Sequence, residues 1–154
     1  MKTLATNYSR APFFLEVSQF VEPLILNPER KLARYNVGAI IAIAQYLGLP
    51  ASKFRQSSEM GVDEQSNEML ISLTRCAGGN TYLCGGGAAG YQDALVFANA
   101  GVNLIHQNFE HPIYPQLGGR PFVPGLSIID ALMNIGVIGV RAALKTAQDF
   151  PREV

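Results

Sequence analysis

The chain has 154 residues, of which 48% are hydrophobic, and it carries 12 basic and 12 acidic side chains. This length and apolar content predict one domain, residues 1–154, with a single core. The balanced charge, without a basic stripe, argues against binding to nucleic acid or to an anionic membrane surface. A small molecule or another protein is therefore the expected partner.

Cysteine content and apolar runs set further limits. Cys76 and Cys84 are too few for a disulfide scaffold and suit a reducing cytoplasm, and no His or Cys spacing is typical of a metal site. The start of the chain has no continuous apolar segment of the kind found in secretory signals. The longest apolar run, residues 37–44, is far below the roughly 20 residues that span a bilayer. We therefore expect a cytoplasmic protein without a membrane span.

Two helices are predicted at the N-terminal end. Apolar residues on one helical face over 12–26 indicate a helix, whose regular part should stop or kink near Glu22 because of Pro23. Asn27 can cap a second helix over 28–47, whose first residue is a proline. Gly48 should close that helix in a left-handed conformation.

Strands and helices alternate in the middle of the chain. The predicted order is a strand over 53–58, a helix over 63–76, a strand over 81–84, a helix over 91–100 and a strand over 102–107. Glycines that follow both helices should end them. Alternation with connections this short implies parallel strands joined by right-handed crossovers.

The fold class that follows is α/β, a small parallel sheet with flanking helices. Its core is a Rossmann-like βαβαβ arrangement, and both ends of the chain are helical. We divide the chain into an N-terminal helical part over 1–49, the βαβαβ core over 50–112, and a loop with C-terminal helices over 113–154.

Polar residues follow the predicted strands. In open parallel sheets, ligands bind outside the carboxyl ends of the strands. Ser57 and Ser58, residues 84–90, and the stretch from Gln107 to His111 should therefore converge on one edge. This convergence is the main argument from the residues for a substrate-binding site.

A glycine-rich turn stands at that edge. Gly85, Gly87 and Gly90 match G-x-G-x-x-G between a predicted strand and a helix that opens at Tyr91. Such glycines permit a tight turn and close approach of a phosphate to a helix N-terminus. The turn could serve helix–strand packing alone, bind a sugar-nucleotide phosphate or carboxylate, or bind a dinucleotide. A dinucleotide site uses paired halves and only one is present, so the cofactor is left unknown, with NAD(P) as the weaker alternative.

The two histidines are interpreted differently. His111 lies in a loop with Tyr114 and Gln116, between prolines that fix the backbone, and binding groups concentrate on such loops. The alternative is a loop that packs its own side chains. His106, inside a predicted strand, is expected to be enclosed and structural. His111 is thus a candidate catalytic base, with Tyr114, Gln116 and Gln107 as candidate substrate ligands.

A helix, or two, is predicted over 127–150, with breaks at Gly136 and Gly139. Asp130 near its start could orient a histidine ring as a catalytic acid. It also completes a capping box with Ser127, and capping is the favoured interpretation. Both roles require that one carboxylate oxygen stays open.

Two further side chains are candidate ligands. Cys84, at a strand end, is either a small buried filler or a nucleophile. Arg55 could clamp a carboxylate or phosphate bidentately, whereas a surface ion pair with Glu59 is the simpler explanation.

The polar clusters at 84–91, 106–116 and 122–130, in this order and spacing, resemble the C-terminal part of the WbqC-like proteins. The match is most specific at 111–116, where His-Pro-Ile-Tyr-Pro-Gln is similar to the family's His-Pro-x-Tyr-x-Gln element. Arg55 and the serines after it resemble a short Arg-Ser-Ser-Glu-like element.

That family is associated with bacterial O-antigen and surface-polysaccharide gene clusters. This association points to transfer of an acyl or aminoacyl group to an amino sugar of a nucleotide- or lipid-linked precursor. Residue type and predicted placement make His111 the candidate general base of that transfer. A non-catalytic binding or assembly module of the same pathway and an NAD(P)-dependent oxidoreductase fragment are the alternatives. The resemblance also implies that this chain lacks an N-terminal region of the family pattern. We therefore expect the chain to expose apolar surface, which that region or a second copy of the chain would cover.

Overall fold

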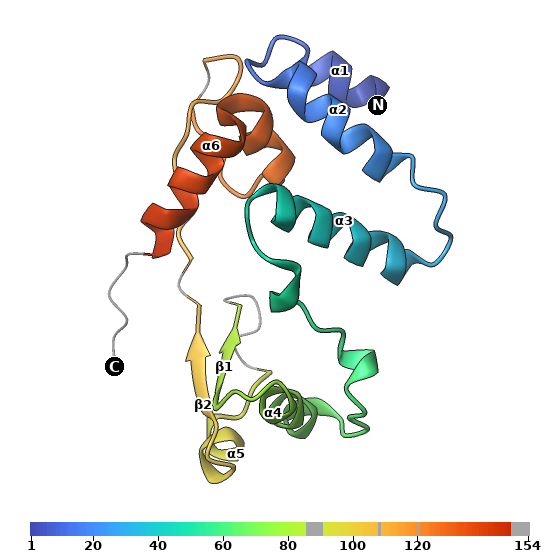
Figure 1. Cartoon of the computed structure of the whole chain (residues 1–154). Coiled ribbons are helices and arrows are strands. Elements are labelled where there is room, and N and C mark those ends of the chain that lie inside the picture. The colour runs from blue at the N-terminus through green and yellow to red at the C-terminus, as the bar shows by residue number, and fades with distance from the viewer. Residues whose placement is uncertain (86–90, 108, 120, 149–154) are drawn as a thin grey trace. The chain divides into compact units, whose positions relative to one another are not determined.

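The structure, a computed structural model, describes residues 1–85, 91–107, 109–119 and 121–148 (Figure 1). Within these residues the chain forms six α-helices, two short 3₁₀ helices and two strands. It divides into two compact units. The helical unit comprises Met1–Ala51 and Glu110–Val154, and the sheet unit comprises Ser52–Phe109.

Three N-terminal helices belong to the helical unit: α1 (Lys2–Tyr8), α2 (Phe14–Ile25) and α3 (Leu32–Tyr46). The helix does not stop near Glu22, because it continues past Pro23 to Ile25. A proline removes one backbone donor and crowds the preceding turn. This proline lies in the last turn, and the N–H of Leu26 still bonds the carbonyl of Glu22 at 2.9 Å.

The start of α3 also differs from the prediction. The side chain of Asn27 accepts the N–H of Glu29 at 3.0 Å, and the Glu29 carboxylate accepts the N–H of Lys31 at 2.8 Å. These local side-chain bonds hold a turn where the cap was expected. The helix therefore begins only at Leu32.

Three predicted glycine stops are confirmed. Gly48, Gly78 and Gly101 follow α3, α4 (Ser66–Cys76) and α5 (Ala94–Asn99), with φ of +83°, +77° and +66°. At each, the glycine N–H and the next N–H bond carbonyls of the last helical turn, which is the Schellman arrangement. Only glycine adopts this backbone without strain.

The last helix, α6 (Ile128–Gln148), is broken at Gly136, where φ is 65° and ψ is 178°. This confirms the predicted break. Gly139 does not break the helix, because Gly136 is its single non-helical residue. A Cβ built on Gly136 would lie 2.6 Å from a ring carbon of Phe13, so the ring occupies the space that a side chain would need.

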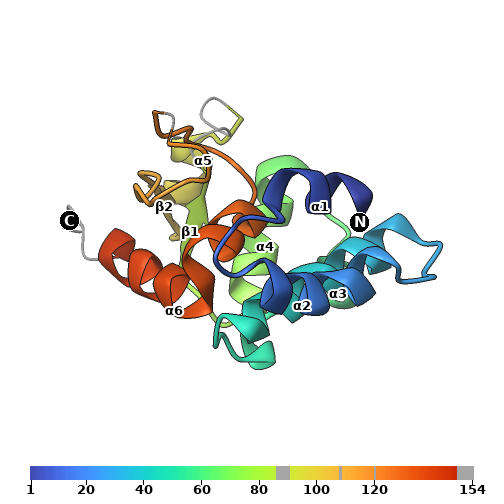
Figure 2. The same cartoon turned by 90° about the horizontal axis from the view of Figure 1, so that it is seen from above.

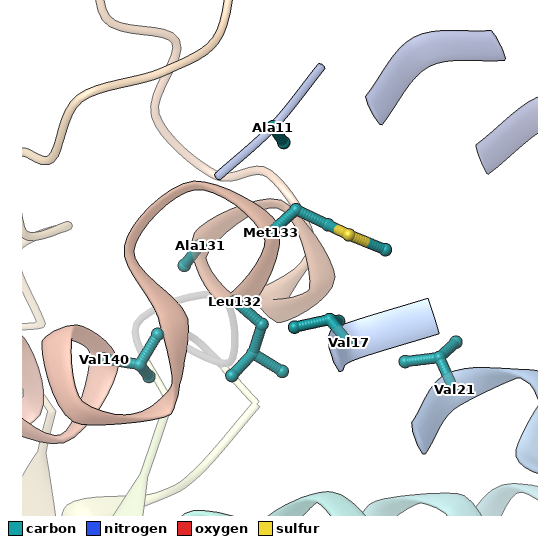
Figure 3. Packing of buried hydrophobic residues seen from close by; sticks show 7 residues of the cluster. All are labelled: Ala11, Val17, Val21, Ala131, Leu132, Met133 and Val140. Carbon is teal, nitrogen blue, oxygen red and sulfur yellow. The ribbon is translucent and has the colours of Figure 1, made fainter. Parts of the chain in front are cut away.

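The core of the helical unit joins α2 to both halves of α6 (Figures 2 and 3). Its buried apolar side chains come from the segment before α2, from α2 and from α6: Ala11, Val17, Val21, Ala131, Leu132, Met133 and Val140. Burial of a side chain of this size contributes about 1.5–3 kcal/mol. The stripe predicted on α2 is thus the face that packs.

The sheet unit contains β1 (Thr81–Cys84) and β2 (Asn103–His106), which pair in parallel (Figure 1). This confirms the predicted pairing of the second and third strands. Helices α4 and α5 cover one face through a second core of Ile71, Phe97 and Val102. The unit is therefore a single βαβ with α4 before it.

The predicted strand over 53–58 is wrong. These residues contain part of a 3₁₀ helix, Ala51–Lys53, and another, Ser57–Glu59. Phe54 is the one apolar residue there, so the segment has no alternating face to bury against a neighbour. Within the described residues the full βαβαβ core is therefore not present, although the fold mixes helices with a two-stranded parallel sheet.

Several large apolar side chains are exposed. On the sheet, Leu83 and Ile105 are 58% and 50% exposed, and on α6 Ile138 is 79% exposed. Apolar surface of this kind was expected from the sequence, whereas the homo-oligomer stays a prediction. Among the described helices none has the length and apolar character needed to cross a bilayer.

Candidate functional site

The parallel register brings Cys84 beside His106 at the carboxyl ends of the two strands. The Cys84 Sγ lies 3.0 Å from the His106 Nδ1, and the N–H of Gln107 donates to the carbonyl of Cys84 at 2.7 Å. Paired residues of neighbouring strands project from the same face of the sheet. The register therefore aims the thiol and the imidazole at one another.

Burial differs sharply between the two partners. Cys84 is 2% exposed, whereas His106 is exposed. The prediction that His106 is enclosed is wrong, because the residue is exposed. Two residues earlier, on the same face, Tyr82 and Leu104 pack into the core of the sheet unit. His106 comes after that packing ends, at the last residue of the strand, so its ring reaches solvent.

The glycine-rich turn follows Cys84 directly. Gly85 is exposed, while Gly87 and Gly90 lie outside the described residues. Tyr91 is 81% exposed and does not begin the helix, because α5 starts at Ala94. The predicted start of that helix is therefore wrong by three residues.

The N-terminus of α5 is closed by the chain itself. The Asp93 carboxylate accepts the N–H of Leu95 at 2.9 Å. A carboxylate at this position stabilises the helix end and repels a phosphate. This observation counts against the dinucleotide fingerprint, in which the same helix end would hold a pyrophosphate.

Arg55, Ser57 and Ser58 are all exposed in the sheet unit. No strand precedes the two serines, so the strand-end rule no longer places them beside Cys84. The Glu59 carboxylate accepts a hydrogen bond from the Gln56 amide at 3.2 Å. Gln107, by contrast, lies directly at the end of β2 and is exposed there, although the predicted strand over 102–107 included it.

In the helical unit, four side chains donate hydrogen bonds to the Asp130 carboxylate. The Tyr8 hydroxyl and the Asn134 amide donate to Oδ1 at 2.8 and 3.2 Å. The Tyr114 hydroxyl and the Gln116 amide donate to Oδ2 at 2.8 and 3.3 Å. Asp130 is only 6% exposed, and a carboxylate offers about four acceptor positions. Both oxygens are therefore engaged, which removes the open oxygen that an additional catalytic role would need.

The capping-box interpretation is wrong for Asp130 and right for Ser127. The Ser127 hydroxyl accepts the N–H of Ile129 at 3.3 Å, as a helix cap does. The Asp130 carboxylate instead receives side chains from α1 and from the 111–116 loop. Each oxygen of the buried carboxylate therefore has hydrogen-bond donors, as buried polar groups in folded proteins normally do.

Burial and the neighbouring carboxylate also shift the two phenols. Burial, followed by the hydrogen bond to Asp130, raises the pKa of Tyr8 from 10.0 to about 12. Burial raises the pKa of Tyr114 as well, and Asp130 contributes in the same direction. Both hydroxyls therefore remain protonated donors well above neutral pH.

The loop that carries His111 is bonded to this carboxylate through Tyr114 and Gln116. His111 is exposed, while Tyr114 and Gln116 are partly buried. The Gln116 side-chain amide donates a hydrogen bond to the carbonyl of Val123 at 2.9 Å and accepts one from the N–H of Val123 at 2.9 Å. It thus bonds both backbone groups of one residue, as a neighbouring strand does. Tyr114 and Gln116 thus use polar atoms to fix the loop. Their predicted contact with substrate stays a prediction, as does the catalytic role of His111.

Comparison with known proteins gives the family. Residues 1–142 match the WbqC-like protein family. This chain belongs to the WbqC-like family. It is 29% identical over 137 residues to an uncharacterised protein of Mycobacterium tuberculosis, Rv1507c, a match that covers 88% of this chain and 58% of that protein. No solved structure matches.

The resemblance inferred from the polar clusters is therefore confirmed at the level of the family. The match begins at residue 1, which gives no support to the expectation that a WbqC-like N-terminal region is missing. The chain spans 58% of the length of the curated relative.

The sequence did not indicate three residues of the two sites, the hydrogen-bond cluster around Asp130 and the Cys84–His106 pair. Asn134 lies one helical turn after Asp130, so the i, i+4 spacing could have indicated the pair. Tyr8 is 122 residues away from Asp130, and no local pattern points to it. His106 could have been paired with Cys84 only by fixing the strand register.

Proposed function

We propose that this WbqC-like protein is a transferase of surface-polysaccharide biosynthesis. It moves an acyl or aminoacyl group onto an amino sugar of a nucleotide-linked or lipid-linked precursor. The substrate class follows from what the family resemblance implies. The reaction class is supported by the residues at the strand ends.

One observation carries the proposal. The one-to-one register of β1 and β2 places Cys84, His106 and the following Gln107 together at the carboxyl ends of parallel strands. Ligand sites of parallel α/β sheets lie at this edge. A thiol, an exposed imidazole and an exposed amide can there bind a carbonyl compound and transfer protons, which is the chemistry that acyl transfer requires.

His111 is a second proposed proton acceptor, in the helical unit. Its loop is fixed through Tyr114 and Gln116 to the buried Asp130 carboxylate, which would hold the histidine backbone in one place. General-base catalysis by a positioned side chain contributes about 10²–10⁴-fold to a rate. The role of His111 is tested separately from that of Cys84, His106 and Gln107.

The test begins with binding. Thermal shift against UDP- and dTDP-linked amino sugars, acyl-CoA and NAD(P) identifies the ligand class, since a ligand at 100 times its dissociation constant adds about 2.7 kcal/mol. Mixtures of the stabilising sugar and acyl donor are then analysed by mass spectrometry for the acylated sugar. Binding of the sugar without product under any donor would favour the non-catalytic binding module. Stabilisation by NAD(P) alone would favour the oxidoreductase alternative.

His111→Ala should lower product formation by about 10²-fold or more if His111 is the base. Ile113→Ala is the matched control, because Ile113 lies in the same loop and is 83% exposed. Unchanged turnover in His111→Ala would assign the proton transfer to another group and refute this role.

A further inference from the structure

We propose that Cys84 and His106 form a nucleophile–base pair that carries the transferred acyl group as a thioester on Cys84. The inference rests on the proposed function and adds its covalent step and donor class. The donor is an acyl thioester.

The pair is built by the strand register. Cys84 and His106 are direct partners in the parallel ladder, and the bond from the Gln107 N–H to the Cys84 carbonyl closes the ladder immediately beyond them. The Sγ–Nδ1 distance of 3.0 Å is a hydrogen-bonding distance for sulfur. With the ring proton on Nε2, Nδ1 accepts the thiol proton directly. A nucleophile in contact with its base is the arrangement of covalent acyl-transfer sites.

A filler role explains the cysteine but not its partner. A free cysteine often packs as a small apolar side chain, and Cys84 is almost fully buried. Packing alone would be served by an apolar residue at position 106, on the face where Tyr82 and Leu104 pack inward. A histidine stands there instead, with its Nδ1 toward sulfur and its ring exposed. The exposed ring gives the buried thiol a route for its proton to and from solvent.

The same chain supplies a reference thiol. Cys76, the last residue of α4, is free and exposed. It has the accessibility that Cys84 lacks, and the hydrogen bonds of the ladder do not involve it. Differences in reactivity between the two cysteines therefore report the environment of Cys84 within one molecule.

The reaction has two balanced steps. In the first, His106 takes the Cys84 proton, the sulfur attacks the donor carbonyl and forms a C–S bond, and the donor's own C–S bond breaks. The released thiolate takes the proton from the imidazolium. In the second, the acceptor amine attacks the new thioester, a C–N bond forms, and the C–S bond to Cys84 breaks. His106 moves the amine proton to the departing sulfur, and the free thiol returns without any oxidant or reductant.

The first test measures thiol reactivity in the folded chain. Iodoacetamide labelling followed by peptide mapping gives separate rates for Cys84 and Cys76 in each sample. We expect Cys84 to react faster than Cys76 although it is the more buried, and His106→Gln to lower the Cys84 to Cys76 ratio by about tenfold or more. A Cys84 rate below that of Cys76, or a ratio unchanged in His106→Gln, would overturn the proposal. His106→Asn and a denatured control keep the comparison valid, because unfolding makes the two rates converge.

The second test traps the intermediate. The chain is incubated with S-acetyl-N-acetylcysteamine, a small acyl thioester that needs no recognition of a carrier. Acetylation of the Cys84 peptide, reversed by neutral hydroxylamine, retained in Cys76→Ser and lost in Cys84→Ser, is the expected result. Absence of this adduct in the parent chain would refute the covalent step.

The outcome separates the two proposals. A Cys84 adduct that no amino sugar discharges would leave the pair intact and refute the proposed acceptor. Acylated sugar formed at the parental rate by Cys84→Ser would refute the pair and leave the proposed function standing.

Discussion

Gly136 offers the sharpest test of how α6 is built. Its φ of 65° and ψ of 178° lie in a region that is essentially restricted to glycine, and backbone strain for another residue there costs about 1–3 kcal/mol. An added Cβ would also lie 2.6, 2.7 and 2.9 Å from three ring carbons of Phe13. Overpacking of a methyl group costs about 1–3 kcal/mol. Gly136→Ala should therefore lower the free energy of unfolding by about 2–6 kcal/mol.

Two variants separate the backbone cost from the steric cost. Gly38→Ala is the matched control, because Gly38 lies within α3 and an added Cβ meets no atom within 4 Å. That change should stabilise the chain by about 0.5–1 kcal/mol, as alanine does in a helix interior. Phe13→Leu combined with Gly136→Ala removes the ring, so the remaining penalty of the alanine should fall to the backbone term of about 1–3 kcal/mol.

The assay is urea unfolding followed by far-ultraviolet circular dichroism, with calorimetry to check that the transition is two-state. The decisive quantity is the coupling between positions 13 and 136 in a double-mutant cycle. Strict additivity, within about 0.5 kcal/mol, would show that the ring does not restrict residue 136. A Gly136→Ala chain as stable as the parent would refute both parts of the reasoning.

Two further predictions concern charge and capping. The pKa of Tyr8 and of Tyr46 is raised from 10.0 to about 12, first by burial and then by hydrogen bonds to Asp130 and Glu16. Since the folded pKa is the higher one, each phenol contributes stability that is present below pH 10 and lost between pH 10 and 12, up to about 2.7 kcal/mol before solvent screening reduces it. The free energy of unfolding should therefore fall across this range, and Tyr8→Phe should flatten part of that slope. An unchanged slope would contradict the assignment. Asp93→Ala removes the side-chain cap of α5 and should cost about 1 kcal/mol, measured by chemical unfolding, and a neutral result would show that the cap contributes nothing.

Glycine stops were predictable because they are local. A positive φ after a helix depends on the residue and its neighbours, so Gly48, Gly78 and Gly101 could be read from the sequence. The parallel pairing of β1 with β2 was also predictable, because a short strand–helix–strand segment allows few arrangements.

The errors have equally specific causes. A proline ends or kinks a helix when it lies in the interior, whereas Pro23 lies in the last turn of α2. The weak alternation over 53–58 indicates a strand, but it contains a single apolar residue, and a strand without an apolar face to bury is not stabilised.

The candidate sites show the limit of a pattern-based reading most clearly. Asp130 was assigned to capping because Ser127 stands three residues earlier, while its actual donors include Tyr8, which is 122 residues away. A contact between residues so far apart in the sequence depends on how α1 packs near α6, and the spacing of neighbouring residues cannot predict it. The hydrogen-bond partners of Asp130 are therefore not the ones that the local pattern predicts.

The partners decide which carboxylates and histidines remain available for chemistry. In the helical unit, Asp130 receives four donors and is buried, so its removal should change stability and loop geometry before it changes any proton transfer. In the sheet unit, the Cys84 Sγ lies 3.0 Å from the Nδ1 of His106, an exposed residue. A one-residue slip of the β1–β2 register would turn Cys84 and His106 to opposite faces and separate them. The chemistry proposed for this edge is thus a property of the strand register, which is why variants that disturb the ladder should abolish Cys84 reactivity even when both side chains are kept.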